Sequence, residues 1–272
     1  MNIHNTDSAI QILGRFFLES VFPQKRSCAF CGRHWSGIRL SAGLCPMCVL
    51  EWRQVKARHR ICPLCGSFDS GDPCRGPCSD IRDLSGIVAA APYAGVYRQR
   101  VMTFKYNGEK DLAAPLAYMM ARAWSERGVK FGATNATNAT NAARPILVPV
   151  PMHIEKEKKR GYNQSRLLAR AVSAETGFPV RELLCRSREG QVQAGLDKWR
   201  RQHALDQVFQ WASPTDQPCG ACVIIDDVVT TGATLESCGK ILAERGCGPV
   251  WGLTFAGGIG IENRTRSWKN SE

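Results

Sequence analysis

The sequence predicts an α/β fold, in which helices cover a parallel sheet, with a smaller metal-built region in front of it. Two observations predict this fold. From residue 85 onward, short apolar runs typical of strands alternate with helical patterns. Within residues 28–78, eight of the thirteen cysteines form four close pairs. Hydrophobic residues make up 44% and charged residues 22% of the 272 positions, which excludes a wholly disordered or collagen-like chain.

The first 25 residues are expected to contribute one short N-terminal helix. Residues 10–22 have the pattern of an amphipathic helix that ends before Pro23. This stretch has no basic leader and no small-residue cleavage site, so we do not interpret it as a signal peptide. Because no run of 18 apolar residues is present, we expect no transmembrane helix and a cytoplasmic location.

Residues 26–80 are predicted to form a double zinc ribbon. Three of the cysteine pairs are C-x2-C and the fourth is C-x3-C, and such tight knuckles present two sulfurs to one tetrahedral ion. A disulfide framework is the alternative, but it needs an oxidising compartment. Sequential pairing and an interleaved cross-brace use the same eight ligands and both stay open. The ligands expected under sequential pairing are Cys28, Cys31, Cys45 and Cys48 for one zinc, and Cys62, Cys65, Cys74 and Cys78 for the other.

The charge balance is basic. Lys plus Arg is 36 against 24 acids, a formal +12, and each four-thiolate zinc site is a net −2, so two sites lower +12 to +8. Residues 24–60 hold eight basic residues against the single acid Glu51. A basic surface of this kind favours single-stranded DNA or phosphate, although the charges could also serve only to solvate the region. The eight are Lys25, Arg26, Arg33, Arg39, Arg53, Lys56, Arg58 and Arg60.

The remainder, residues 85–261, is predicted to be the α/β domain. The low-complexity repeat at 133–142 predicts a surface loop inside it. Helices are expected over residues 93–106, 112–124, 164–175 and 234–245. Strands are expected at residues 86–92, 146–151, 221–225 and 250–255.

One strand end carries the segment that predicts chemistry, Val223-Ile-Ile-Asp-Asp-Val-Val-Thr-Thr-Gly-Ala-Thr234. Its adjacent carboxylates, Asp226 and Asp227, suit hydrogen bonds from a vicinal diol. Gly232 lets the backbone approach a ligand closely, and the amides of the following helix N-terminus face a phosphate. A diol with a phosphate indicates a ribose 5-phosphate; a metal site or a helix cap is the alternative. The expected ligand-binding residues are Asp226, Asp227, Thr230, Thr231, Gly232, Ala233 and Thr234.

This segment resembles the signature of type I phosphoribosyltransferases, which bind phosphoribosyl pyrophosphate (PRPP). Further motifs, together with the cysteine-rich front end, resemble the ComF family of ComFC- and GntX-like proteins over about residues 16–256. These motifs are Phe104-Lys-Tyr106, Val148-Pro-Val-Pro151, Arg160-Gly-Tyr-Asn-Gln164, and Gln193-Ala-Gly-Leu196 with Arg200 and Arg201.

The resemblance implies a type I phosphoribosyltransferase-like fold, PRPP binding with Mg2+, and a link to DNA uptake in natural competence. It implies that Asp226 and Asp227 are the catalytic residues, and that residues 151–160 form a pyrophosphate loop in which Arg160 binds PRPP. A flexible loop at 187–203 would close over the ligand. The family commonly has asparagine at the position of His203, which leaves the role of that residue open.

Three functions remain open from the sequence. The chain could be an enzyme that transfers the phosphoribosyl group to an acceptor. It could be a non-catalytic module that senses PRPP. It could also be a module that binds single-stranded DNA and works with DNA-uptake proteins. The sequence identifies no acceptor pocket, and turnover and oligomeric state stay open.

Overall fold

The computed structural model describes residues 26–35, 41–69, 74, 76–129, 144–186, 208–212 and 220–260. Three expected features, the helix at 10–22, the repeat at 133–142 and the loop at 187–203, lie outside the described residues. No helix within these described ranges is long and apolar enough to cross a membrane.

Four parallel strands form the central sheet in the order β3-β8-β7-β4. Their bounds are Gly86–Pro92 for β3, Val250–Gly257 for β8, Cys222–Val229 for β7 and Ile146–Pro149 for β4. Most of their residues are buried, including the whole of β3. Continuous burial is typical of a parallel sheet covered on both faces. The predicted parallel α/β sheet is therefore confirmed.

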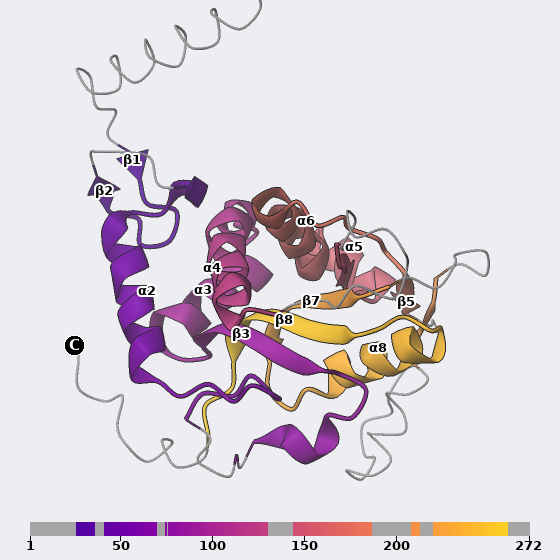
Figure 1. Cartoon of the computed structure of the whole chain (residues 1–272). Coiled ribbons are helices and arrows are strands. Elements are labelled where there is room, and N and C mark those ends of the chain that lie inside the picture. Colours follow the sequence, from indigo (N-terminus) through magenta and orange to yellow (C-terminus); the bar gives the residue numbers. More distant parts are fainter. Residues whose placement is uncertain are drawn as a thin grey trace, which may run out of the picture.

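Helices cover both faces of the sheet (Figure 1). Helices α3 (Gly95–Tyr106), α4 (Ala113–Arg127) and α6 (Gln164–Thr176) lie on one face, and α8 (Ala233–Glu244) lies on the other. Glycines in the left-handed conformation, Gly128 and Gly177, end α4 and α6 because a residue without a side chain adopts that conformation at little cost. The shorter elements here are η3 (Lys110–Leu112), α5 (Ile154–Arg160), β5 (Leu184–Arg186) and β6 (Phe209–Trp211).

The cysteine-rich region consists of helix α2 and two cysteine knuckles. The first knuckle holds Cys28, Cys31, Cys45 and Cys48, and the second holds Cys62, Cys65, Cys74 and Cys78. The elements of the region are β1 (Arg26–Ser27), β2 (His34–Trp35), η1 (Ser41–Gly43), α2 (Pro46–Arg58) and η2 (Pro77–Asp80). Helix α2 packs beside the sheet: the Trp52 indole Nε1 donates a 2.8 Å hydrogen bond to the Ala90 carbonyl of β3. The Phe30 ring lies 5.9 Å from the Tyr97 ring of α3, centroid to centroid. The first knuckle therefore shares one hydrophobic core with the helical layer.

The second knuckle is joined to the sheet edge through its backbone. The Ile87 amide donates to the Leu64 carbonyl at 3.0 Å, and the Phe68 amide donates to the Gly258 carbonyl at 2.8 Å. Phe68 is fully buried among residues of the α8 face. The division into a 26–80 ribbon and an 85–261 domain stays a prediction, and the two parts share both hydrophobic clusters.

Candidate functional site

The two aspartates of the predicted motif lie inside a strand, not beyond its end. Strand β7 continues to Val229, so the sequence prediction that both carboxylates leave an exposed strand end is wrong. The two carboxylates contact different helices of the same layer, Asp226 through Ser165 of α6 and Asp227 through Lys105 of α3. Asp227 is buried and Asp226 is partly buried. Longer pairing with β8, which extends to the Val229–Gly257 register, accounts for the difference.

Asp227 forms an ion pair with Lys105 of helix α3. The Lys105 ammonium in the last turn of α3 lies 2.8 Å from the Asp227 Oδ1 atom. Burial alone would lower the pKa of Lys105, but the nearby Asp227 and Asp226 carboxylates outweigh it and raise the net pKa. The lysine is therefore a cation that partly neutralises two adjacent carboxylates.

Asp226 has a different environment. Its Oδ1 atom accepts a 2.8 Å hydrogen bond from the Ser165 hydroxyl in the first turn of α6, and another, at 2.9 Å, from the Asp227 amide. Burial, followed by repulsion from Asp227, raises the pKa of Asp226 to about 7, although the Ser165 hydroxyl and Lys105 act in the opposite direction. The pair can therefore carry either one or two negative charges near neutral pH.

The loop after β7 combines exposed threonines with a left-handed glycine. Thr230 and Thr231 are exposed, and Gly232 adopts the left-handed conformation with φ of 77°. Gly232 is the N-cap of α8 and has no side chain with which to cap it. The Thr231 hydroxyl accepts a long 3.4 Å hydrogen bond from the Ala233 amide. The first amides of a 12-residue helix therefore lie next to two exposed threonines, an arrangement that suits an anion.

The expected pyrophosphate loop at 151–160 is largely helical, as α5. The His153 Nδ1 atom caps this helix by accepting from the Glu155 amide at 3.3 Å. Acids fill the first turn of α5 and bases fill its last turn, which complements the helix dipole. Arg160 ends α5, and its guanidinium lies 5.1 Å from the centroid of the Tyr106 ring.

The segment Phe104-Lys-Tyr106 joins these separate motifs, which sequence reasoning did not foresee. The Phe104 carbonyl accepts a hydrogen bond from the Tyr162 hydroxyl, Lys105 pairs with Asp227, and Tyr106 stacks on Arg160. Next to Tyr162, Asn163 caps α6 by accepting from the Ser165 and Arg166 amides. The signal for Lys105 was present in the family-like segment, but nothing local to it indicated its partner.

The eight close-paired cysteines gather into two groups of four, as sequential pairing predicts. In each group the sulfurs lie within 4.8 Å of one another. Individual sulfur pairs are 3.9 Å apart for Cys28 and Cys48, and 3.7 Å apart for Cys65 and Cys74. A tetrahedral zinc ion with bonds of about 2.3 Å to sulfur needs sulfur pairs about 3.8 Å apart. Each group could therefore hold one zinc ion, and the cross-brace is excluded.

The electrostatics of the two groups also favour a divalent cation. Burial, followed by hydrogen bonding to neighbouring thiols, raises the pKa of the Cys48 thiol, and the same causes raise the pKa of Cys78. Four thiolates at this spacing repel one another unless a cation lies between them. When bound, zinc would supply that charge and hold each knuckle closed.

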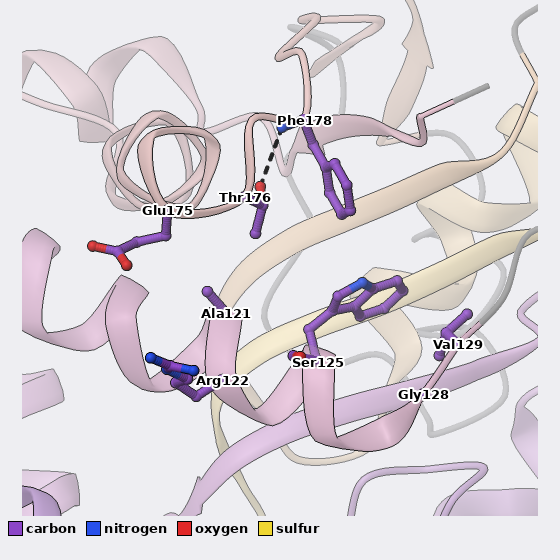
Figure 2. A pocket seen from close by; sticks show the side chains of 9 residues that line it. Ala121, Arg122, Ser125, Gly128, Val129, Glu175, Thr176 and Phe178 are labelled. Carbon is purple, nitrogen blue, oxygen red and sulfur yellow. Dashed lines mark hydrogen bonds between the residues drawn. The ribbon is translucent and has the colours of Figure 1, made fainter. Parts of the chain in front are cut away.

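A pocket of about 510 Å³ lies between the ends of α4 and α6 (Figure 2). Arg122 from α4, and Glu175 and Phe178 from the end of α6 and the residues after it, line part of it. The Thr176 hydroxyl beside it accepts from the Phe178 amide at 3.2 Å. Thr176 lies about 16 Å along α6 from Ser165, so the pocket is at the opposite end of the helix from the aspartates and is not part of their site.

Fold and site together define a class: a parallel α/β protein with two adjacent aspartates in the second half of β7, an exposed threonine–glycine turn after that strand, and two four-cysteine groups. No family model matches the chain. Competence protein F of Haemophilus influenzae is 33% identical over 114 residues, which is 40% of this chain and 50% of that protein. Competence protein ComFC of Bacillus subtilis is 31% identical over 101 residues, 37% of this chain and 39% of that protein. The predicted resemblance to the ComF family is confirmed, although the chain spans half or less of these curated relatives.

Solved structures of phosphoribosyltransferases are also similar to the chain. Trypanosoma cruzi hypoxanthine phosphoribosyl transferase is 14% identical with a TM-score of 0.31, covering 60% of this chain and 74% of that chain. A glutamic acid mutant from an analysis of an invariant aspartic acid in HPRTs is 14% identical with a TM-score of 0.29, covering 61% and 78%. TM-scores this low add nothing to the site; the sheet order, the strand-end motif and the cysteine groups define the fold class.

Proposed function

We propose that this chain is a ComF-type, phosphoribosyltransferase-like protein that binds PRPP with Mg2+ at the end of β7. The observation that carries the proposal is the run from Asp226 to Thr234. There, two carboxylates precede exposed threonines, a left-handed glycine and the open N-terminus of α8. The carboxylates would hold the ribose diol, and the turn with the first amides of α8 would hold the 5-phosphate.

Arg160 would bind the diphosphate. It ends a helix whose last turn also carries Lys158 and Lys159, and its stacking on Tyr106 orients the guanidinium. A guanidinium matches the geometry of phosphate oxygens and stays charged at any physiological pH. Bound Mg2+ would neutralise part of the charge on the diphosphate.

If the chain turns PRPP over, the bond between C1 of the ribose and the pyrophosphate oxygen breaks, and pyrophosphate leaves with the electron pair. An acceptor nucleophile then forms its bond to C1, and its proton passes to the departing pyrophosphate. Asp226 and Asp227 would fix the ribose and stabilise positive charge that develops on the ring. The contribution of the chain would be orientation and electrostatics.

The relatives carry the name competence protein, and we propose a role in DNA uptake on that basis. A non-catalytic PRPP sensor and a single-stranded DNA module are the alternatives within this role. The DNA alternative is favoured by one observation: Arg33, Arg53 and Arg58 are exposed on the first knuckle and α2.

A thermal-shift screen separates these functions. The zinc-loaded chain is tested against PRPP, ribose 5-phosphate, nucleotides and single-stranded DNA, each with and without Mg2+. PRPP should raise the melting temperature most, and more with Mg2+. Pyrophosphate release with a candidate acceptor would identify an enzyme, whereas binding without release would favour a sensor. No stabilisation by PRPP or ribose 5-phosphate at millimolar concentration would contradict the proposal.

A further inference from the structure

Lys105 is a lysine held in place from both sides. Its side chain is 22% exposed, and that of its partner Asp227 is 8% exposed. A lysine this far from water is rare unless it is paired. The residue before it accepts a hydrogen bond from Tyr162, and the residue after it stacks on Arg160. The turn that carries the ammonium is therefore fixed by the same motif that the proposed function uses for the diphosphate.

The position of this cation makes the two aspartates unequal. Lys105 lies 2.8 Å from Asp227 Oδ1, whereas Asp226 Oδ1 is held by the Ser165 hydroxyl and a backbone amide. An ammonium favours the charged form of a carboxylate in contact with it. A neutral hydroxyl does so less strongly, because it carries no net charge.

We infer that Lys105 is the positioning residue of the diol site: it fixes the Asp227 side chain through the ion pair at Oδ1 and leaves Oδ2 to accept a hydrogen bond from the ligand. This inference rests on the proposed function for the identity of the ligand. The ion pair itself exists without a ligand and can be tested separately. Lys105 acts through Asp227 and does not touch the sugar.

The test uses the full zinc-loaded chain and three variants. Lys105→Met removes the charge while keeping most of the length, and Lys105→Arg restores a cation. Lys110→Met is the matched control, because it removes an exposed positive charge from the same region without contact to Asp227. In the ligand-free proteins, the titration of Asp226 is followed by carboxyl-carbon NMR. In the same proteins, the affinity for PRPP with Mg2+ is measured by calorimetry.

Lys105→Met should move the titration of Asp226 upward from about 7, because it removes a nearby cation. It should also weaken PRPP binding by about tenfold or more, the scale of one hydrogen bond to a charged group. Lys105→Arg should restore most of the Asp226 titration and of the PRPP affinity, and Lys110→Met should change neither quantity. An unchanged Asp226 titration in Lys105→Met would overturn the inference. If the titration shifts but no protein binds PRPP, the ligand assignment fails and the positioning of Asp227 stands.

Lys105→Met could unfold the chain by leaving Asp227 unpaired in the core. The double variant Lys105→Met/Asp227→Asn removes both charges and keeps the question answerable. Compared with Asp227→Asn alone, the added lysine change should lower the melting temperature and the PRPP affinity little, because its partner is already neutral. A further tenfold loss of affinity in the double variant would show that Lys105 binds the ligand directly, which contradicts a positioning role.

Discussion

The two cysteine groups use the same four ligands but contact different parts of the sheet. The first group lies in a core with α3 and α4, through the Trp52 hydrogen bond to Ala90 and the packing of Phe30 on Tyr97. The second group lies near the candidate ligand site. Three residues after Cys78, the Ile81 side chain packs so closely on Gly232 that a Cβ there would lie 2.6 Å from Ile81 Cδ1.

The segment between Cys78 and β3 also contacts the first turn of α8. The Glu236 carboxylate in the first turn of α8 accepts 2.7 Å hydrogen bonds from the amides of Arg82 and Asp83. Burial raises the pKa of Glu236, although these amides act in the opposite direction. The same four-cysteine arrangement therefore supports the hydrophobic core in the first group and the conformation of the candidate ligand loop in the second.

Loss of the first group should give the largest effect. Cys28→Ser should lower the melting temperature by more than about 10 °C, because metal binding and folding are coupled and this knuckle shares its core with the helical layer. Differential scanning calorimetry with zinc analysis measures both quantities. Two zinc ions in the parent and about one in the variant are expected. An unchanged melting temperature would show that the first knuckle is an appendage to the sheet.

Loss of the second group should affect ligand binding as well as stability. Cys78→Ser should weaken PRPP binding by about tenfold, the scale of one charge-assisted hydrogen bond. Without the second zinc, residues 81–83 are no longer held against Gly232 and Glu236. Calorimetry at a temperature where both variants are folded, with Cys28→Ser as the matched control, measures the difference. Equal losses of affinity in the two variants would remove the distinction between the groups.

A pH effect should mark the acidic end of β7. The pKa of Asp226 is raised to about 7 in the folded chain, so the folded state binds its proton more tightly than the unfolded state. The stabilisation that this proton gives is present at low pH and is lost as pH rises through about 7. Between pH 6 and 8 the melting temperature of the parent should therefore fall by a few degrees more than that of Asp226→Asn. Parallel pH profiles would mean that Asp226 does not titrate in this range.

The smallest expected effect is on the binding of single-stranded DNA by the exposed arginines of the first knuckle and α2. Reversing Arg33, Arg53 and Arg58 to Glu should weaken single-stranded DNA binding and lower its salt slope by about 2, at about 0.7 per phosphate. Lys56 is left unchanged because its ammonium contacts Glu126 and lies over the Trp52 ring. Fluorescence anisotropy over a salt series makes the measurement. PRPP affinity should stay the same, and unchanged DNA binding at low salt would assign these charges to solvation alone.

Sequence reasoning succeeded where the signal is local. Cysteine spacing predicts the close pairs, because a C-x2-C knuckle forms within a few residues, but spacing leaves open which pairs share one ion, and it is the structure that groups them. The apolar run before Asp226 predicts strand β7, and Gly232 predicts the turn into α8, because both signals lie within a few residues of the element they predict.

The rest depends on contacts between distant segments. The ion pair of Lys105 with Asp227, the approach of Ile81 to Gly232 and the Trp52 hydrogen bond join residues far apart in the chain. No periodicity or spacing encodes such partners. Helix α5 was missed because its seven residues are too few and too polar to show an apolar face.

The most direct test is isothermal titration calorimetry of PRPP with Mg2+ into the zinc-loaded full chain and into Asp226→Asn/Asp227→Asn. Binding at one site per chain is expected in the parent. No measurable binding is expected in the double variant, whose thermal unfolding should remain cooperative. Equal affinity in the two proteins would contradict the placement of the ribose at the end of β7.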